Sequence, residues 1–93
     1  MGIRQYWIYI LVSGSGNAMY ISVTNNIERR IWEHRNGQGS EFAKKYRATR
    51  LVYSEEYDNP NDAIAREKQL KGWRRERKTE LVRTINPGFR DLM

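Results

Sequence analysis

Hydrophobic positions near the start of the chain cluster in two short segments that are typical of β-strands. Residues 6–12 (YWIYILV) and 18–23 (AMYISV) are rich in β-branched and aromatic residues, which favour strands. Between them lies SGSGN, a run of turn-forming residues. If residues 13–16 form the loop, the register of the hairpin pairs Tyr9 with Tyr20. The pattern therefore predicts a β-hairpin whose two tyrosines share one face.

The next segment has apolar residues at helical spacing. Ile27 and Ile31 lie four positions apart and give one apolar stripe. Asn25 with Glu28 three positions later resembles a capping box at the start of a helix. Asn36-Gly37 is a typical helix end. We therefore expect a helix between these two signals.

The remaining pattern predicts one more strand and two more helices. Residues 50–57 (RLVYSEEY) have strand character, and residues 40–46 before them are expected to form a short helix or turn. A helix opens near Pro60, bends at Gly72 and is followed by a last helix over residues 74–85. The expected order is β-β-α-β-α-α, which is an α/β (α+β) fold.

The composition sets limits on the class of protein. A chain of 93 residues fits a single domain, 1–93, and its 39% hydrophobic residues allow a packed core. No apolar run approaches the length of about 18–20 residues that a membrane span requires, so we expect a cytoplasmic protein. Cysteine is absent and there is one histidine, which excludes disulfides, thiol catalysis and zinc fingers.

The charge indicates a polyanionic partner. The net charge is +6, and residues 66–78 carry seven Lys or Arg against two Glu. Candidate contacts with a nucleic-acid backbone lie in this run and in the first helix: Arg29, Lys68, Lys71, Arg74 and Arg75. The alternatives are a solvated helix face, or a small basic protein that binds the ribosome or a protein partner.

A second feature is the regular placement of Tyr20, Arg30 and His34. Arg30 and His34 lie four positions apart in the predicted helix and so emerge together on one face. Phosphodiester hydrolysis needs an activated water and cationic stabilisation of the developing charge. A tyrosine can accept a proton when a nearby cation lowers its pKa, and an arginine fork suits phosphate. Composition alone does not select these residues from six tyrosines and eleven acidic residues.

Four motifs together resemble the GIY-YIG nuclease superfamily. They are YIY at 8–10, YIS at 20–22, NNIERR at 25–30 and AREKQLKGW at 65–73. The resemblance extends from Tyr6 to Leu92 and is greatest to the small stand-alone bacterial branch, which is related to the N-terminal domain of the excinuclease C protein. Each motif is short, and it is their spacing that makes the resemblance specific.

The resemblance implies a fold, an activity and a set of site residues. The implied fold is a three-stranded antiparallel sheet flanked by helices. The implied activity is endonucleolytic hydrolysis of DNA with Mg²⁺ (or Mn²⁺), in repair or DNA processing, with either tyrosine activating water. The positions that match the family's functional residues are Tyr9, Tyr20, Arg30 and His34 for catalysis, Glu67 for the metal and Asn86 for possible support.

Three positions depart from the family's pattern. Ser22 stands where the second motif ends in glycine, Trp7 stands at the glycine of the first motif, and Val23 stands where a lysine is common. A serine adds a Cβ and a hydroxyl where glycine permits close approach. The alternative function is therefore a non-catalytic nucleic-acid-binding module whose site is impaired by Ser22.

Single residues of the set also have structural explanations. A tyrosine pair is common on a half-buried sheet face, and His34 suits the C-terminal end of a helix. Glu67 and Lys71 are spaced for a surface ion pair worth about 0.2–0.5 kcal/mol. Trp32 and Trp73 are expected to pack in the core rather than to stack on bases.

Overall fold

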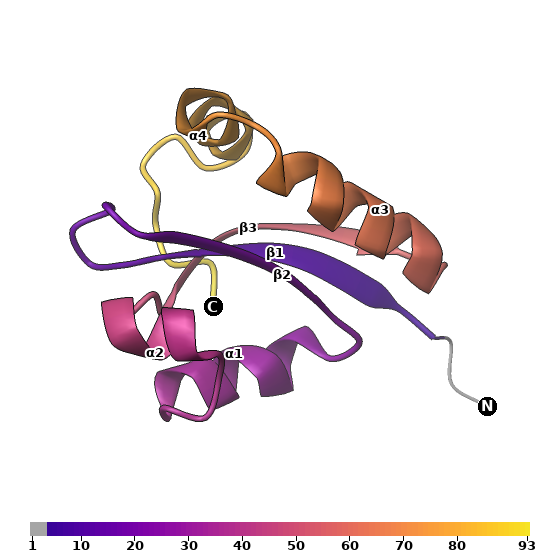
Figure 1. Cartoon of the computed structure of the whole chain (residues 1–93), viewed down its shortest axis with the longest axis horizontal. Helices are drawn as coiled ribbons and strands as arrows, with labels where there is room; N and C mark the ends of the chain where they lie inside the picture. The colour runs from indigo at the N-terminus through magenta and orange to yellow at the C-terminus, as the bar shows by residue number, and fades with distance from the viewer. Residues whose placement is uncertain (1–3) are drawn as a thin grey trace.

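The central feature of the fold is a three-stranded antiparallel sheet with helices on both faces (Figure 1). A computed structural model describes residues 4–93. The strands are β1 (Tyr6–Val12), β2 (Met19–Thr24) and β3 (Arg50–Tyr57), and they lie in the order β2-β1-β3. The helices are α1 (Ile27–Arg35), α2 (Glu41–Tyr46), α3 (Pro60–Lys71) and α4 (Arg75–Arg83). The predicted fold class is confirmed, with residues 41–46 forming the short helix of the two expected options.

The central strand β1 separates two hydrophobic cores. Its residues Ile8, Ile10 and Val12 are fully buried in the core that includes Leu70 of α3 and Val82 of α4. The alternate residues of β1 point to the opposite face, where Tyr9 and Leu11 pack with Ile31 of α1 and Ala43 of α2. Tyr9 is therefore a residue of the α1–α2 face, across the sheet from α3 and α4 (Figure 1).

The hairpin register differs from the predicted one by two residues. Tyr9 lies opposite Ser22, and Leu11 lies opposite Tyr20. The predicted pairing of Tyr9 with Tyr20 is therefore wrong. The last strand residues to pair are Val12 and Met19, and the backbone N–H of Ser13 bonds to the carbonyl of Ala18 at 3.0 Å, so the turn lies one residue later in the chain than predicted. A shift of two residues preserves the side of the sheet, so both tyrosines still lie on one face.

The ends of α1 show one confirmed and one wrong expectation. The N-cap is Asn26, one residue after the predicted Asn25, and its side chain accepts from the backbone N–H of Arg29. Asn36 is the C-cap as expected, and Gly37 follows in the left-handed region with φ 75°, which glycine adopts without strain. The one-residue shift of the N-cap leaves Arg30 and His34 inside α1, four positions apart, so both side chains still emerge on one side of the helix.

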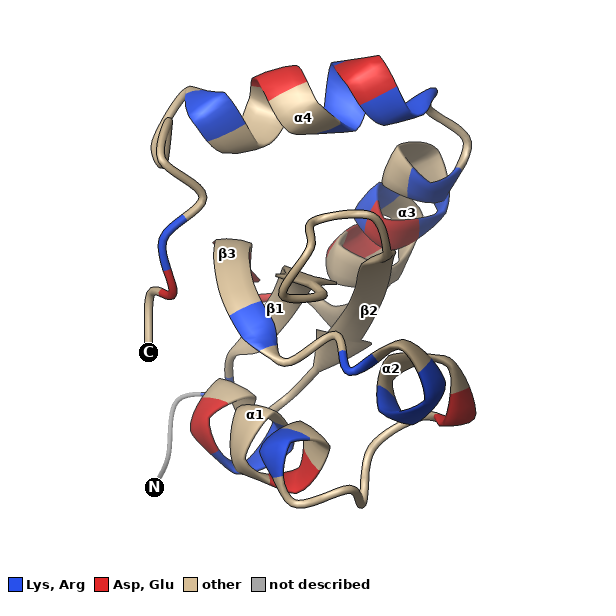
Figure 2. Ribbon diagram, turned by 90° about the vertical axis from the view of Figure 1, so that its left-hand side faces the viewer, with Lys and Arg blue, Asp and Glu red and all other residues tan. Residues whose placement is uncertain are grey.

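The two C-terminal helices are separate elements. The first ends at Lys71, Gly72 caps it, and α4 begins at Arg75 rather than at 74 and ends before 85. In Figure 2, α4 runs at an angle to α3, and both lie on the opposite side of the sheet from α1 and α2. Among residues 4–93, none of the helices is both long and apolar enough to span a membrane.

Candidate active site

Three aromatic rings from three elements meet on the α1 face of the sheet. The ring centroids of Tyr9 on β1 and Tyr20 on β2 are 6.3 Å apart. The His34 ring on α1 lies 5.8 Å from Tyr9 and 5.5 Å from Tyr20, edge-on to both. The predicted catalytic residues from the hairpin and the helix are therefore brought together by the fold.

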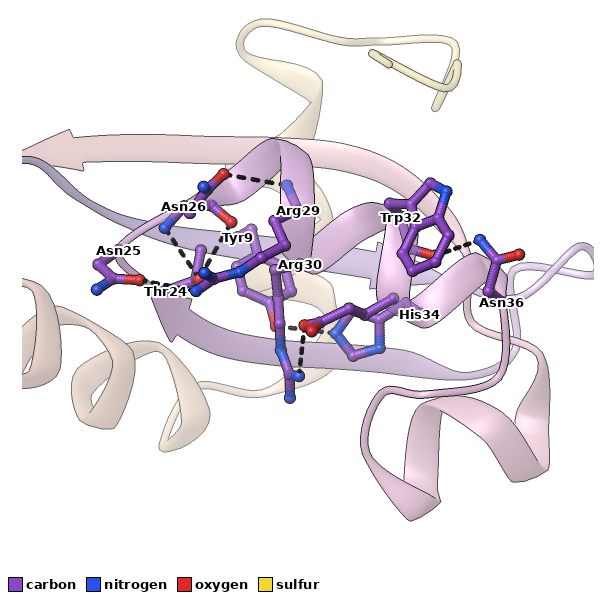
Figure 3. Close-up of polar contacts among 10 residues, drawn as sticks. Tyr9, Thr24, Asn25, Asn26, Arg29, Arg30, Trp32, His34 and Asn36 are labelled. Carbon is purple, nitrogen blue, oxygen red and sulfur yellow. Dashed lines mark hydrogen bonds and ion pairs between the residues drawn. The ribbon is translucent and has the colours of Figure 1, made fainter.

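Tyr9 and His34 form the buried part of this cluster. The Tyr9 Oη and the His34 Nε2 share a hydrogen bond of 2.9 Å, drawn in Figure 3. Tyr9 has 0% of its surface exposed and His34 has 4%. Burial raises the pKa of Tyr9, and the neighbouring Arg30 opposes this in part. Burial lowers the pKa of His34 and the Arg30 charge lowers it further, so His34 is a neutral imidazole near neutral pH.

A close glycine fixes the position of the His34 ring. A Cβ added at Gly39 would clash with His34 Nδ1, so this position tolerates no larger side chain while the ring stays in place. Gly39 follows α1 in the turn before α2. The same Nδ1 is buried and has no hydrogen-bond partner among the described residues. The polar contact of the ring is therefore directed to Tyr9 alone.

Tyr20 is the half-buried member of the cluster, and its environment favours ionisation. Burial acts to raise its pKa, but the combined effect of its neighbours is larger and the pKa is lowered. The hydroxyls of Ser22 and Ser40 act on the phenol by hydrogen bonding, and Arg30 and Lys71 act through their charges. Each of these groups stabilises the phenolate form.

Arg30 supplies the positive charge of the cluster. Its guanidinium pairs with Glu33 at 3.2 Å between Nη1 and Oε1. The interaction with Tyr9 raises the pKa of Arg30 further, so this side chain remains charged. In Figure 3, Arg30 and His34 project from α1 toward Tyr9, while Trp32 lies apart from them. The predicted i, i+4 placement is thus present in the structure.

Two comparisons address the family of this chain. The model of the GIY-YIG catalytic domain matches residues 5–80. The chain belongs to the GIY-YIG family. A UPF0213 protein from Staphylococcus saprophyticus is 36% identical over 84% of this chain and 94% of the relative. A UPF0213 protein from Limosilactobacillus reuteri is 33% identical over 88% of this chain and 86% of the relative.

The GIY-YIG chain also resembles a solved structure. The solution NMR structure of a UPF0213 protein from Bacillus halodurans is 26% identical, with a TM-score of 0.59. The match covers 91% of this chain and 89% of that one. Family membership indicates a nuclease acting on nucleic acid, whereas the names of these relatives state no activity.

The acidic residue expected to bind metal lies on α3. Glu67 pairs with Lys71 of the same helix, with 3.3 Å between Oε2 and Nζ, and its side chain is 15% exposed. Lys71 is one of the charges that act on Tyr20, so this part of α3 lies near the cluster. Within residues 4–93 there is no group of three or more His, Cys, Asp or Glu able to hold an ion. A single carboxylate oxygen donor fits Mg²⁺ only where phosphate oxygens and waters complete the shell.

The residues expected to bind nucleic acid differ in the contacts that their side chains already make within the protein. Lys68 and Arg74 are exposed on the α3–α4 side. Arg29 is exposed on α1 and bonds the Asn25 side chain at 3.4 Å. Arg75 instead donates to the backbone carbonyls of Asn17, at 2.7 Å, and Gly16 in the hairpin loop. Arg75 therefore fastens α4 to the hairpin, although its charge remains at the surface.

Asn86 lies apart from the cluster. It is buried, and its Nδ2 donates to the carbonyls of Val52 at 3.1 Å and Arg90 at 2.8 Å. Its Oδ1 accepts from the backbone N–H of Arg90. These contacts organise the segment after α4 against β3. The structure does not bring Asn86 together with the predicted catalytic residues.

Two aromatic residues of the site were not selected from the sequence. Phe42 of α2 stacks on Tyr20 with 6.0 Å between ring centroids, and Tyr46 lies 4.8 Å beyond it. Their spacing of four positions in a short helix is a signal that places both on one face. The expectation that Trp32 packs in the core is wrong, because it is 57% exposed. Trp73 does pack against the core, and Arg77 lies over its ring.

Proposed function

We propose that this GIY-YIG protein is a metal-dependent endonuclease that hydrolyses phosphodiester bonds in DNA. The observation that carries the proposal is the meeting of the Tyr20 ring with the rings of Tyr9 and His34, 6.3 Å and 5.5 Å away. The Arg30 guanidinium belongs to the same site, and its charge is one of the influences that lower the pKa of Tyr20. A base and a cation placed together are what water attack on phosphorus requires. Family membership independently supports a nuclease.

Tyr20 is the better candidate for the base. Tyr20 is half-buried and its pKa is lowered, whereas Tyr9 is fully buried and its pKa is raised. As a phenolate, Tyr20 accepts a proton from water while the water oxygen forms the new bond to phosphorus. The bond from phosphorus to the leaving oxygen of the sugar breaks, and that oxygen takes a proton from solvent to become a hydroxyl. A base of pKa closer to neutrality is the more effective at physiological pH.

Tyr9, His34 and Arg30 have supporting roles in this scheme. Arg30 stabilises the negative charge that accumulates on the phosphate oxygens, for which a guanidinium fork is well suited. The hydrogen bond between Tyr9 and His34 holds both rings against Tyr20. Because His34 is buried and its pKa is lowered, it adds no second charge beside Arg30. The pair therefore positions Tyr20 without competing for the phosphate.

Glu67 is the residue that would hold the divalent cation. Its carboxylate is mostly covered and has Lys71 as its partner. An ion such as Mg²⁺ or Mn²⁺, when bound with the substrate, neutralises charge on the phosphate oxygens. We propose that the protein acts on DNA in the cytoplasm, in repair or another DNA-processing step.

The alternative of a site blocked by Ser22 has less support. The Ser22 hydroxyl lies beside both phenols and acts to lower the pKa of each. It stands directly opposite Tyr9 in the register and two residues from Tyr20 on the same strand. A hydroxyl that stabilises the phenolate assists a tyrosine base rather than impairing it.

The metal assignment predicts the effect of a nearly isosteric substitution. Glu67→Gln removes the charge but keeps the size, and we expect the Mg²⁺-dependent cleavage rate of a labelled DNA to fall by about a hundredfold or more. Addition of EDTA to the wild type is expected to have the same effect. The control is Glu76→Gln on the exposed start of α4, which should cleave normally. Cleavage by Glu67→Gln at the wild-type rate, with an unchanged circular dichroism spectrum, would exclude Glu67 as the ligand.

A further inference from the structure

A surface groove runs along the outer edge of β2, beside Tyr20. It consists of two adjoining hollows that share Met19 and Phe42. One hollow reaches Tyr20, Lys71 and Lys78, and the other reaches Tyr46. Since β2 is an edge strand of the sheet, the groove is open to solvent and continuous with the proposed catalytic cluster.

One wall of the groove is a series of aromatic rings. The Tyr20 and Phe42 rings are stacked at 6.0 Å with an interplanar angle of 23°. The Tyr46 ring follows at 4.8 Å from Phe42, tilted by 48°. Phe42 is 43% exposed and Tyr46 is 46% exposed. Neither ring belongs to the two cores, so packing of the fold does not explain their presence.

The other wall is basic. Lys71 at the end of α3 and Lys78 of α4 line the hollow that contains Tyr20. Arg75 lines the hollow beside Tyr46. On the aromatic side, Lys45 of α2 adds a positive charge 5.4 Å from the Tyr46 ring centre. Figure 2 shows α2 on one side of β2 and α3 with α4 on the other, each bearing Lys or Arg. An exposed aromatic wall facing cations has the chemistry of a site for a single nucleic-acid strand.

We propose that Phe42 and Tyr46 form a stacking subsite for the unpaired bases of a DNA strand. The phosphates of that strand lie along Lys71, Lys78 and Arg75, and the strand leads to Tyr20. Bases in a duplex already stack on both neighbours, so only an unpaired or frayed base offers a free face to these rings. The inference rests on the proposed function for the ligand, and it specifies single-stranded or locally opened DNA as the substrate.

The test is a binding measurement that requires no cleavage. Fluorescence anisotropy in EDTA, at one fixed salt concentration, compares a labelled single strand, its duplex, and a strand of the same length with abasic sites. The proteins are the wild type, Tyr46→Ala and Phe42→Leu, with Trp32→Ala as the matched control. Trp32 is the more exposed aromatic residue and lies outside the groove. Phe42→Leu keeps an apolar side chain against Tyr20, and circular dichroism verifies the fold of each variant.

We expect Tyr46→Ala and Phe42→Leu to weaken binding of the single strand by about fivefold to a hundredfold. Binding of the duplex should change by less than about twofold, because its contacts are phosphates. The abasic strand should bind the wild type about as weakly as the normal strand binds Tyr46→Ala. Trp32→Ala should bind like the wild type.

Unchanged single-strand affinity in both groove variants would overturn the subsite. An equal loss for the single strand, the duplex and the abasic strand would do the same, because it would reflect phosphate contacts or a disturbed fold. The outcome is separable from that of the proposed function. Selective loss of single-strand binding in a protein that never cleaves DNA would retain the subsite and refute the nuclease. Cleavage of DNA by the wild type, with no selective loss of single-strand binding in Tyr46→Ala and Phe42→Leu, would retain the nuclease and refute the subsite.

Discussion

Tyr9 and Tyr20 carry the same phenol group in opposite electrostatic settings. Burial dominates at Tyr9 and raises its pKa, whereas neighbouring hydroxyls and positive charges dominate at Tyr20 and lower its pKa. The difference arises from position in the sheet: Tyr9 is on the central strand and Tyr20 is on an edge strand. The proposed division of roles, with Tyr20 as the base and Tyr9 as its support, follows from this difference.

The role of the Ser22 hydroxyl can be tested with single substitutions of that residue. Ser22→Ala removes the hydroxyl and keeps the Cβ, so we expect the pKa of the Tyr20 phenol to rise. The cleavage rate at neutral pH should then fall by about several-fold, and the rise of the rate with pH should move to higher pH. Ser22→Gly should behave in the same way. A faster enzyme after Ser22→Gly, but not after Ser22→Ala, would instead show that the Cβ obstructs the site.

The buried His34 predicts a pH dependence of stability. The pKa of His34 is lowered from 6.5 by burial and by Arg30, so below about pH 6.5 the unfolded chain takes up a proton that the folded protein does not. The free energy of unfolding should therefore decrease as the pH falls from about 7 to about 5. Glu55 also has a lowered pKa, but its contribution is lost only below about 4.5.

Urea unfolding at several pH values measures this dependence. His34 is the single histidine of the chain, so His34→Gln should flatten the slope between about pH 7 and 5. An identical slope in the wild type and the variant would mean that the imidazole takes up a proton as readily in the folded protein as in the unfolded chain.

At the scale of elements, α3 is fastened to β3 by one carboxylate. Glu55 of β3 accepts from Arg66 of α3 at 2.9 Å and 3.0 Å, from the Tyr57 hydroxyl at 2.6 Å and from the Tyr53 hydroxyl. The side chains of Glu55 and Arg66 are 19% and 22% exposed. Glu67 follows Arg66 in the chain, so the same contact sets the position of the proposed metal ligand.

Loss of this carboxylate should destabilise the fold. Glu55→Ala leaves a guanidinium and two phenols without their partner, and we expect a cost of about 1–3 kcal/mol in the free energy of unfolding. The neighbouring Glu56→Ala, on the exposed position of the same strand, should change it by less than about 0.5 kcal/mol. Equal effects of the two substitutions in urea unfolding would show that the contact contributes little.

Local patterns predicted the elements of this fold and the hairpin of the first two strands, but not the register of that hairpin. The strands over residues 6–12 and 50–57 were predicted with the bounds that the structure has, because their apolar and aromatic content is dense. The hairpin register was missed because a turn displaced by one residue leaves Tyr9 and Tyr20 on the same face of the sheet. The cap moved from Asn25 to Asn26 because adjacent asparagines offer equivalent side chains. A register is decided by packing of the whole sheet, which a local pattern does not contain.

The candidate site was predicted in part for a similar reason. Family motifs identified Tyr9, Tyr20, Arg30 and His34, and the fold brings these four together. Motifs do not report burial, so they gave no distinction between the two tyrosines. Phe42 was not identified because a contact between α2 and β2 depends on the arrangement of elements far apart in the sequence. Asn86 matched a motif, yet its contacts are all with backbone groups near β3.

In the molecule as a whole, the residues of the main hydrophobic core and the residues of the candidate site lie on different parts of the sheet. The α3–α4 face holds the larger core and the α1 face holds the aromatic cluster, while the open groove lies at the edge of β2 between the two faces. The net charge of the chain is +6, and each of α2, α3 and α4 beside that groove has more Lys and Arg than Asp and Glu. A strand of DNA drawn to this field would thus meet the cluster at the sheet edge.

The nuclease assignment is tested most directly by the rate at which Arg30→Ala cleaves labelled DNA in Mg²⁺, measured beside the wild type and Arg29→Ala. Arg29 is the adjacent, exposed arginine of α1, and its loss should weaken DNA binding and leave the maximal rate nearly unchanged. We predict metal-dependent cleavage by the wild type and a fall of about a hundredfold or more in Arg30→Ala. Equal cleavage by all three proteins, or no cleavage by the wild type of any single-stranded, duplex or branched DNA, would contradict the assignment of this cluster as a nuclease site.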